Sequence, residues 1–205
     1  MLMRLYDGGR SPNPRRVRIF FAEKGIALPE LIPVDIAKKE HLTPEFTRIN
    51  PMRRLPVLEL DDGTALAETI AICRYLESLH PEPALFGRDA KEQGQIEMWN
   101  RRVELGLFSS VMAVFRHSHP SMVELEHQVP EWADANRELI DDHLLLLDLQ
   151  LAANPFLCGE LMTVADITAG IAVDFMRPSR IPLPEDFANI RRWHGELAAR
   201  PSWAA

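Results

Sequence analysis

The sequence predicts an α/β domain followed by an all-helical domain. Strand-like apolar runs alternate with helical patterns over residues 1–79, whereas residues 88–205 contain helical patterns alone. A proline-rich segment at 80–87 separates the two patterns. The length of 205 residues suits one large domain or two small ones. We therefore expect domains over 1–79 and 88–205, joined by a linker at 80–87.

The first predicted element is a strand at residues 2–6, and a helix follows it. The run Ser11-Pro12-Asn13-Pro14 stands between them. Asn13 is a favourable N-cap residue and Pro14 a favourable first helical residue, so we expect the helix to begin there. Gly25 is placed to end this helix.

The rest of the first domain continues the alternation. Residues 31–36 have the composition of a second strand. Residues 55–60 and 64–67 flank Asp61-Asp62-Gly63, a sequence typical of a hairpin turn. Apolar residues return at helical spacing over 69–79. The predicted order is strand, helix, strand, hairpin and helix.

The second domain is predicted to open with a long helix from about Asp89 that is apolar on two faces. A helix with two apolar faces needs two burial partners, its own core and either a cleft or another subunit. One face holds Ile96, Trp99, Val103, Leu107, Val111 and Val114, and the other holds Leu105, Phe108, Met112 and Phe115.

Two more helices follow. One runs from Pro130 through residues 144–147. The other starts at Thr163, and Asp166 is placed to complete a capping box with it. Because this last helix is apolar nearly all round up to Phe175, we expect it to be central and buried.

Composition limits the classes of function. The net charge of -7 argues against a nucleic-acid partner, which requires a basic surface. No apolar run approaches the roughly 20 residues that span a bilayer, and the first residues lack the apolar core of a signal peptide. The two cysteines, Cys73 and Cys158, stand in apolar contexts that favour buried, reduced thiols. We expect a cytoplasmic protein without a membrane partner.

Charge is distributed unevenly along the chain. Residues 1–80 hold 12 basic and 11 acidic residues, a net charge of +1, and the remainder holds 11 and 19, a net charge of -8. The nearly neutral first part, which includes Arg15, Arg16, Arg18, Arg53 and Arg54, is the better place for a small anion. Taken singly, most of these arginines are equally compatible with a solvated surface.

The junction between the first strand and helix indicates thiol chemistry of an unusual kind. Thioredoxin-like redox enzymes carry Cys-x-x-Cys at such a junction. Here Ser11 and Pro14 occupy the two cysteine positions. The junction therefore has no thiol of its own for disulfide exchange, but it can act on a thiol that another molecule brings.

Four motifs in order along the chain resemble the cytosolic glutathione S-transferase family. They are Tyr6 with Ser11-Pro12-Asn13-Pro14-Arg15-Arg16-Val17, Asn50-Pro51-Met52-Arg53-Arg54-Leu55-Pro56-Val57-Leu58, Glu68-Thr69-x-Ala71-Ile72 with Tyr75-Leu76, and Phe156-Leu157-Cys158-Gly159 with Thr163-Val164-Ala165-Asp166. Each motif alone is weak, and the four in register are specific. The resemblance implies a thioredoxin-like domain followed by an all-α domain, usually in a homodimer.

The resemblance also implies a glutathione site in the first domain. Pro56 is expected to be cis, so that the amide and carbonyl of Leu55 pair with the cysteine of glutathione like a strand edge. Glu68 would take the ammonium group of the γ-glutamyl end. Thr69, at a helix N-terminus, would bind its carboxylate. Ordinary helix capping at Glu68-Thr69 is the alternative, and it is compatible with binding.

The glycine carboxylate of glutathione needs a cation at the opposite end. Arg54 occupies a position where the family often has lysine, and His41 lies in a loop that often contributes. A surface histidine is an equal alternative for His41. Arg53 departs from the glycine common at its position.

Two residues are candidates for activating the glutathione thiol. Ser11 resembles the catalytic serine of theta-like and zeta-like classes, where the hydroxyl donates to the thiolate. A turn or capping role for Ser11 is the alternative, with Asn13 and free backbone amides near the sulfur. The runs Arg15-Arg16-Val17-Arg18-Ile19 and Asn100-Arg101-Arg102-Val103-Glu104-Leu105 also resemble an atypical, yeast-type subgroup. There a water held by the helical domain can serve, and His117 is our candidate to hold it.

The remaining site assignments follow from the same resemblance. A hydrophobic electrophile would bind between the domains near Arg10, Phe108, Met112, Phe115 and Arg116, with Tyr6 and Phe175 beside them. Some of these side chains are equally suited to a plain core. The histidines near His117 match no closed zinc spacing, so we expect no metal.

The predicted function is conjugation of the glutathione thiolate, as co-substrate, to small hydrophobic electrophiles. One alternative is a non-catalytic glutathione-binding or ligand-binding module. Another is a glutathione-dependent peroxidase or reductase in which glutathione supplies every thiol.

Overall fold

The computed structural model describes residues 3–205, which form two compact units. The first contains the chain up to Ala84 together with Pro201–Ala205, and the second contains Leu85–Arg200. The return of the last five residues to the first unit has no counterpart in the sequence pattern.

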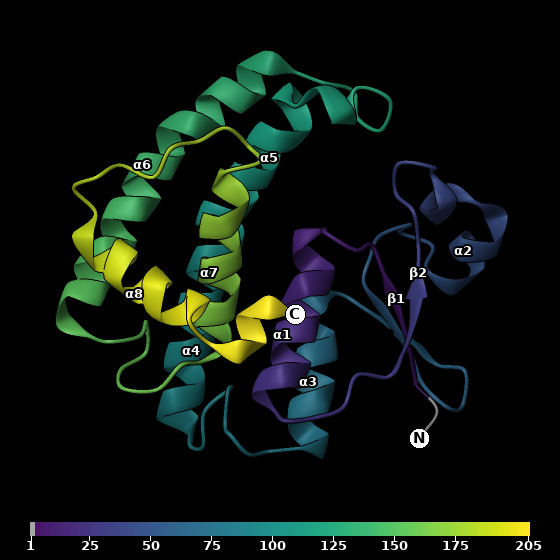
Figure 1. Ribbon diagram of the computed structural model, residues 1–205, viewed down its shortest axis with the longest axis horizontal. Coiled ribbons are helices and arrows are strands. Elements are labelled where there is room, and N and C mark those ends of the chain that lie inside the picture. Colours follow the sequence, from purple (N-terminus) through teal and green to yellow (C-terminus); the bar gives the residue numbers. More distant parts are fainter. Residues whose placement is uncertain (1–2) are drawn as a thin grey trace. The chain divides into compact units, whose positions relative to one another are not determined.

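The first unit is built on a four-stranded mixed sheet with the strand order β2-β1-β3-β4. β1 pairs parallel with β2 and antiparallel with β3, and β3 pairs antiparallel with β4. Figure 1 shows α1 and α3 on one side of this sheet and α2 on the other. The elements are β1 (Arg4–Asp7), α1 (Pro12–Glu23), β2 (Glu30–Pro33), η1 (Glu40–Leu42), α2 (Pro44–Ile49), β3 (Val57–Glu59), β4 (Ala65–Ala67), α3 (Thr69–Leu79) and η4 (Pro201–Ala204). The predicted α/β class is confirmed.

The start of α1 differs from the sequence prediction. The helix begins at Pro12 with Ser11 as its N-cap, so Asn13 lies inside the first turn and does not cap it. Pro12 suits the first helical position as well as Pro14 does, and the extended backbone of Ser11 is that of an N-cap residue. Gly25 ends the helix as predicted, with a φ of 63°. The first predicted strand is shifted, since β1 begins at Arg4, and Leu2 lies outside the described residues.

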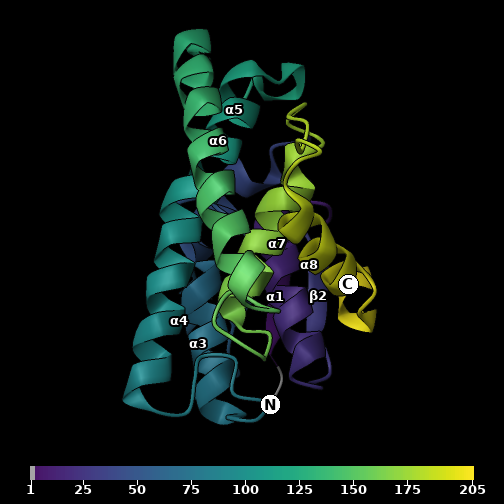
Figure 2. The same ribbon diagram turned by 90° about the vertical axis from the view of Figure 1, so that its left-hand side faces the viewer.

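The second unit is helical throughout, which confirms the predicted all-α class. Its elements are α4 (Ala90–Arg102), η2 (Val103–Phe108), α5 (Ser109–Ser118), η3 (Pro120–Met122), α6 (Pro130–Ala153), α7 (Val164–Met176) and α8 (Ala188–Ala198). α7 is buried along nearly its whole length and carries the predicted capping box of Thr163 and Asp166. Figure 2 shows α5 alongside α6, the pair with the most extensive contact in this unit.

The long helix predicted from Asp89 is interrupted. Between α4 and α5 the backbone forms a π-helical segment, η2, which changes the faces that the following residues occupy. Within this segment Phe108 is buried, whereas Leu105 is 71% exposed. The prediction of one unbroken α-helix from Asp89 is wrong, because the backbone changes its period at η2.

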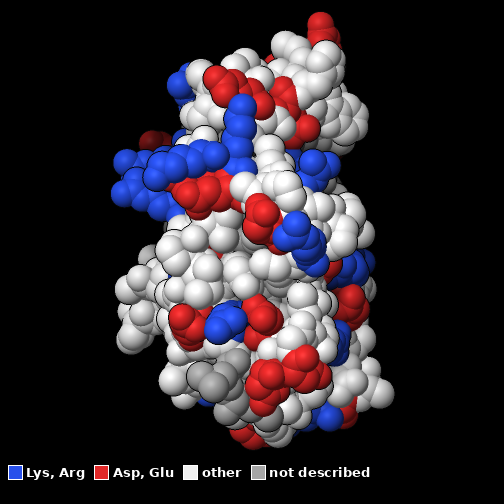
Figure 3. Space-filling view, turned by 90° about the vertical axis from the view of Figure 1, so that its right-hand side faces the viewer, with Lys and Arg blue, Asp and Glu red and all other residues white. Residues whose placement is uncertain are grey.

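Surface properties give two further observations. Within residues 3–205, no helix is long and apolar enough to cross a membrane. Figure 3 shows acidic and basic side chains intermingled over one face, with a group of Lys and Arg gathered at its edge.

Candidate functional site

Three motif segments of the first unit meet at one end of its sheet. Residues 8–13 follow β1, residues 55–56 precede β3, and residues 68–69 follow β4. Because β3 runs antiparallel to both β1 and β4, with Val57 opposite Tyr6 and Ala67, the three segments emerge at the same end. We call this set of segments the loop end of the sheet.

Close packing at Gly8 joins two of these segments. A Cβ atom added to Gly8 would lie 2.9 Å from the Ser11 Oγ and 3.1 Å from the Leu55 Cδ1. A larger residue would therefore require the side chains of Ser11, Leu55 and Ile36, whose Cδ1 would lie 2.9 Å away, to move. The glycine lets Ser11 and Leu55 converge on the same point.

The α1 terminus keeps one backbone donor unused. The Ser11 amide donates to the Gly8 carbonyl at 3.3 Å, and the Arg15 amide donates to the Ser11 carbonyl at 3.3 Å. Pro12 and Pro14 have no N–H. Among the described residues, the Asn13 amide has no acceptor. Since a helix N-terminus carries partial positive charge, this N–H is a donor suited to an anion.

The hydroxyl of Ser11 is already engaged. Its Oγ donates to the Gly8 carbonyl at 3.0 Å. Within residues 3–205 it makes no capping hydrogen bond to α1. To donate to a bound sulfur, the hydroxyl would have to leave the Gly8 carbonyl.

The Leu55-Pro56 peptide is cis, as the family resemblance implied. Neither the amide nor the carbonyl of Leu55 has a hydrogen-bond partner among residues 3–205. The segment before it is fixed by Asn50, whose Nδ2 donates to the Arg54 carbonyl at 2.8 Å. Leu55 therefore presents both backbone groups of a strand edge.

Glu68 has a backbone conformation that is unfavourable for its residue type. Its φ is 66° and its ψ is 119°, and it precedes α3 as the N-cap residue. No described residue pairs with its exposed side chain. Strain of this kind is typical of functional positions, where it costs about 1–3 kcal/mol. The next residue, Thr69, is buried and contributes the first amide of α3, which has no acceptor within the helix.

His41 is close enough to the positively charged side chains of Arg53 and Arg54 to be influenced by them. His41 is buried, and its Nδ1 has no partner among residues 3–205. Burial lowers the pKa of His41, and the charges of Arg54 and Arg53 lower it further, so the imidazole is neutral at pH 7. Arg53 is exposed and has a φ of 53°, a conformation that glycine adopts without strain.

His117, the second catalytic candidate, lies in the last turn of α5 in the second unit. Its Nδ1 accepts a hydrogen bond of 3.1 Å from the Val129 amide. This acceptor role leaves the proton of the neutral ring on Nε2, which is then a donor. Nearby, Arg116 forms an ion pair of 2.7 Å with Glu126, so its guanidinium holds the segment after α5.

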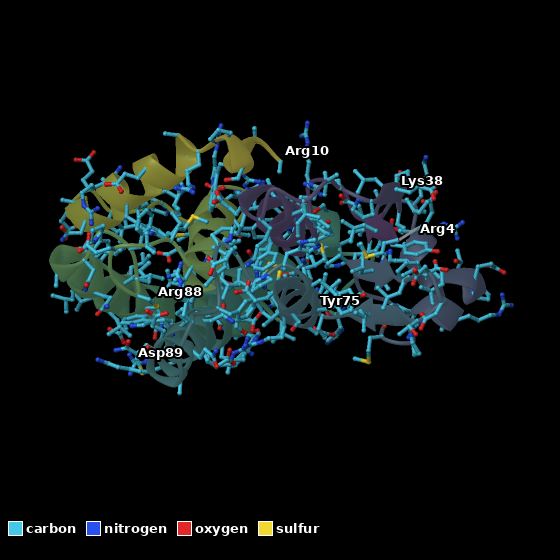
Figure 4. The ribbon with its side chains drawn as sticks, turned by 90° about the horizontal axis from the view of Figure 1, so that it is seen from below. Arg4, Arg10, Lys38, Tyr75, Arg88 and Asp89 are labelled. Carbon is cyan, nitrogen blue, oxygen red and sulfur yellow. The ribbon has the colours of Figure 1, made fainter. Side chains whose placement is uncertain are left out.

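The predicted electrophile residues differ in their environments. Phe108 is buried, and Met112 and Phe115 are half-buried on α5. The ring of Phe115 lies edge-on to Phe175, with their centroids 4.9 Å apart. Arg10 is exposed, and Figure 4 shows its side chain pointing away from the ribbon.

Two features of the first unit were missed by the sequence analysis. Asp7 and Arg18 form an ion pair beside the α1 junction, and Trp203 packs its ring under the Arg15 guanidinium. The Asp7-Gly8-Gly9 run is typical of a turn and so indicates the loop in which the ion pair of Asp7 lies. The second joins residues far apart in sequence, and no local pattern marks it.

The two cysteines lack the environment of a reactive thiol. Cys73 is buried, and burial raises the pKa of the half-buried Cys158 to about 12, which makes it a poor nucleophile at neutral pH. In the part of the chain that the structure describes, no three His, Cys, Asp or Glu side chains gather as a metal site would require.

Comparisons with known proteins agree with the fold and the motifs. Residues 10–79 match the glutathione S-transferase N-terminal domain and residues 110–201 the glutathione S-transferase C-terminal domain. Glutathione S-transferase 2 of Saccharomyces cerevisiae is 36% identical over 204 residues, which cover 98% of this chain and 87% of that protein.

Solved structures show the same relationship. A glutathione S-transferase domain-containing protein from Marinobacter aquaeolei VT8 superposes with a TM-score of 0.94 and 39% identity, covering 98% of this chain and 99% of that one. Gtt2 from Saccharomyces cerevisiae superposes with a TM-score of 0.93 and 35% identity, covering 98% of each chain. The chain therefore belongs to the glutathione S-transferase family of enzymes.

Proposed function

We propose that this protein conjugates the thiolate of glutathione to small hydrophobic electrophiles. The observation that carries the proposal is the loop end of the sheet, where three unsatisfied binding elements meet. They are the Asn13 amide, the backbone edge of Leu55 and the strained Glu68. They suit the thiol, the cysteinyl backbone and the γ-glutamyl end of glutathione, respectively.

The γ-glutamyl end of glutathione carries one ammonium and one carboxylate group. The exposed Glu68 carboxylate suits the ammonium group. The amide and hydroxyl of Thr69, at the positive end of α3, suit the carboxylate. The backbone strain at Glu68 supports this role, because nothing in the fold of the described residues uses its side chain.

The other two parts of glutathione follow in order. The cysteinyl residue pairs with the amide and carbonyl of Leu55, beside Pro56. The glycine carboxylate lies near Arg54 and His41. Because the lowered pKa keeps His41 neutral, Arg54 supplies the positive charge and His41 a neutral hydrogen bond.

Thiol activation requires preferential stabilisation of the thiolate. Lowering a pKa of 8.5 by two units takes about 2.7 kcal/mol. The α1 terminus supplies about 0.3–1 kcal/mol, and one charge-assisted hydrogen bond supplies about 1.5–3 kcal/mol. The Asn13 amide provides such a bond without rearrangement, Ser11 provides one after its hydroxyl rotates, and His117 provides one from Nε2 or through a water.

The thiolate sulfur then attacks the electrophilic carbon. A carbon–sulfur bond forms, and the leaving group departs with its electron pair. We propose that Phe108, Met112 and Phe115 line the electrophile site, that Arg10 contributes to it, and that Arg116 holds the neighbouring segment through Glu126. No metal takes part in this scheme.

The proposal also covers the oligomeric state of the protein, its location in the cell and its domain division. The 71% exposed Leu105 and the exposed Met98 on α4 support a homodimer, because a dimer interface would cover these apolar side chains. We propose a cytoplasmic enzyme with domains at 1–79 and 88–205 and a linker at 80–87, in which the last five residues of the second domain lie with the first unit.

Binding to immobilised glutathione, followed by conjugation to an aryl halide and reduction of an organic hydroperoxide, tests the function. We expect wild type to bind and to conjugate. Binding without turnover would favour a ligand-binding module, and hydroperoxide reduction alone would favour a peroxidase. Failure to bind glutathione would refute the proposed site.

Two variants in the same assay separate the activating groups. Ser11→Ala removes the hydroxyl, and His117→Ala removes the Nε2 donor. A loss of more than about tenfold in kcat, roughly 1.4 kcal/mol, in only one of them would identify the activator. If neither variant loses that much, the backbone amide of Asn13 is the remaining candidate.

A further inference from the structure

The loop that precedes α1 is held by a clamp of Asp7 and Arg18. The Asp7 Oδ1 accepts a hydrogen bond of 2.7 Å from the Gly9 amide, and the Asp7 Oδ2 accepts one of 2.5 Å from the Arg18 Nη1. The Arg18 Nη2 donates to the Gly9 carbonyl at 3.1 Å. Asp7 and Arg18 therefore bind both backbone groups of Gly9 and each other.

Burial makes this clamp persistent. The side chains of Asp7 and Arg18 are 8% and 13% exposed, so water competes little for the ion pair between them, whereas the bond from Arg18 to the Gly9 carbonyl lies at the surface. The two residues belong to the last position of β1 and the middle of α1. The clamp thus links the end of a strand to the helix that starts beyond the loop.

The clamp adjoins the turn that leads to the groups proposed to bind the thiol. Gly9 adopts a φ of 62°, and the chain then turns so that the Gly8 carbonyl accepts both the amide and the hydroxyl of Ser11. Asn13 follows two residues later with its unused amide. A shift of Gly9 would displace this amide relative to Leu55, which packs against Gly8.

We propose that Asp7 and Arg18 are positioning residues that fix the α1 terminus for stabilising the glutathione thiolate. This inference rests on the proposed function of the loop end. It predicts that loosening the clamp changes the ionisation of the bound thiol more than the affinity for glutathione, since neither residue belongs to the segments proposed to bind the γ-glutamyl or glycine end.

The test measures the pKa of the bound thiol from the pH dependence of kcat/KM for the electrophile at saturating glutathione, with glutathione affinity and Tm recorded for each variant. Arg18→Gln removes the charge and the bridge to Gly9, and we expect the thiol pKa to rise by about one unit, a loss of about tenfold in thiolate below that pKa. Affinity for glutathione should change by less than about threefold. Arg18→Lys keeps the charge, but its single ammonium group cannot bind the Asp7 carboxylate and the Gly9 carbonyl with the geometry of a planar guanidinium. We therefore expect a smaller rise in the thiol pKa for this variant.

Arg4→Gln is the matched control. Arg4 lies in β1 and pairs with Glu30 at 3.1 Å, but it is at the opposite end of the strand from the α1 junction. We expect no change in the thiol pKa of this variant. A variant of Arg18 that lowers Tm with an unchanged thiol pKa would overturn the positioning role and leave the proposed function intact. A wild type that fails to bind glutathione would refute both.

Discussion

The N-termini of α1 and α7 show how the same type of structure serves two purposes. At α7, Asp166 accepts hydrogen bonds from the Thr163 amide and hydroxyl, each at 2.9 Å. The Leu157 amide and the Trp193 indole also donate to it, at 2.9 and 3.0 Å. At α1, no side chain of the described residues caps the helix, and the Asn13 amide stays unused.

The difference separates stability from binding. The α7 terminus is closed by groups of its own unit, so its positive end is already satisfied and contributes to the fold. The α1 terminus begins with two prolines in its first three residues, which remove amides without adding an acceptor. Its remaining donor is available to an anion from outside the protein.

Asp166→Asn is the change with the largest expected effect. The substitution replaces one carboxylate oxygen by an NH2 group, so two of the four donors lose their acceptor in a fully buried position. We expect the free energy of unfolding to fall by about 3 kcal/mol and Tm by about 6–12 °C. Calorimetry or denaturant unfolding measures both.

Ser11→Ala is the matched variant at the other terminus. The Ser11 side chain makes one hydrogen bond, to the Gly8 carbonyl, and no bond to α1 among residues 3–205. We expect the free energy of unfolding to change by less than about 1 kcal/mol. Equal losses in the two variants would contradict the distinction between a closed and an open terminus.

Asn13→Pro tests the open terminus directly. Proline removes the amide N–H from a first-turn position that tolerates it, and Asn13→Ala retains the N–H as a control. Loss of one charge-assisted hydrogen bond, about 1.5–3 kcal/mol, should lower kcat/KM by about 10–100-fold in the proline variant. The alanine variant should stay within about threefold of wild type. Similar losses in both would assign the effect to the side chain.

The sequence was sufficient for the parts of the site that depend on local patterns. It predicted Glu68-Thr69 at the start of α3 and the capping box of α7, because both are defined by neighbouring residues. The cis peptide at Pro56 followed from the family resemblance.

Other features required the structure, for physical reasons. Asn13 and Ser11 are both good N-cap residues, and each precedes a proline, so propensity could not choose between them. The π-helical segment η2 includes a close contact within the second unit, since a Cβ on Gly106 would lie 2.7 Å from the ring of His143. No sequence period marks such a contact.

Substitutions to glycine at Glu68 and Arg53 compare the backbone strain at two positions of the first unit. Both residues have positive φ, 66° and 53°, which glycine adopts freely. Each change should raise the free energy of unfolding by about 0.5–1 kcal/mol, the relief of strain less the entropy cost of glycine. Glu68→Gly should also weaken glutathione binding more than tenfold, because a charged partner is lost. Arg53→Gly should alter it by less than about threefold, and calorimetric titration distinguishes the two.

The smallest expected effect is a pH dependence that comes from His41. Its pKa is lowered by burial and then by Arg54 and Arg53, so the unfolded chain binds a proton at a higher pH than the folded protein does. Stability from this group is therefore present above the unfolded pKa of about 6.5 and is lost as the pH falls toward the folded value. Below pH 6.5, we expect the free energy of unfolding of His41→Gln to fall less steeply with falling pH than that of wild type. The two slopes should differ by at most about 1.4 kcal/mol per pH unit, measured by urea unfolding. His80→Gln, at an exposed position after α3, should leave the slope unchanged. A slope that stays the same in His41→Gln would place the acid sensitivity elsewhere and remove His41 from the buried, neutral role that we propose for it at the glycine carboxylate.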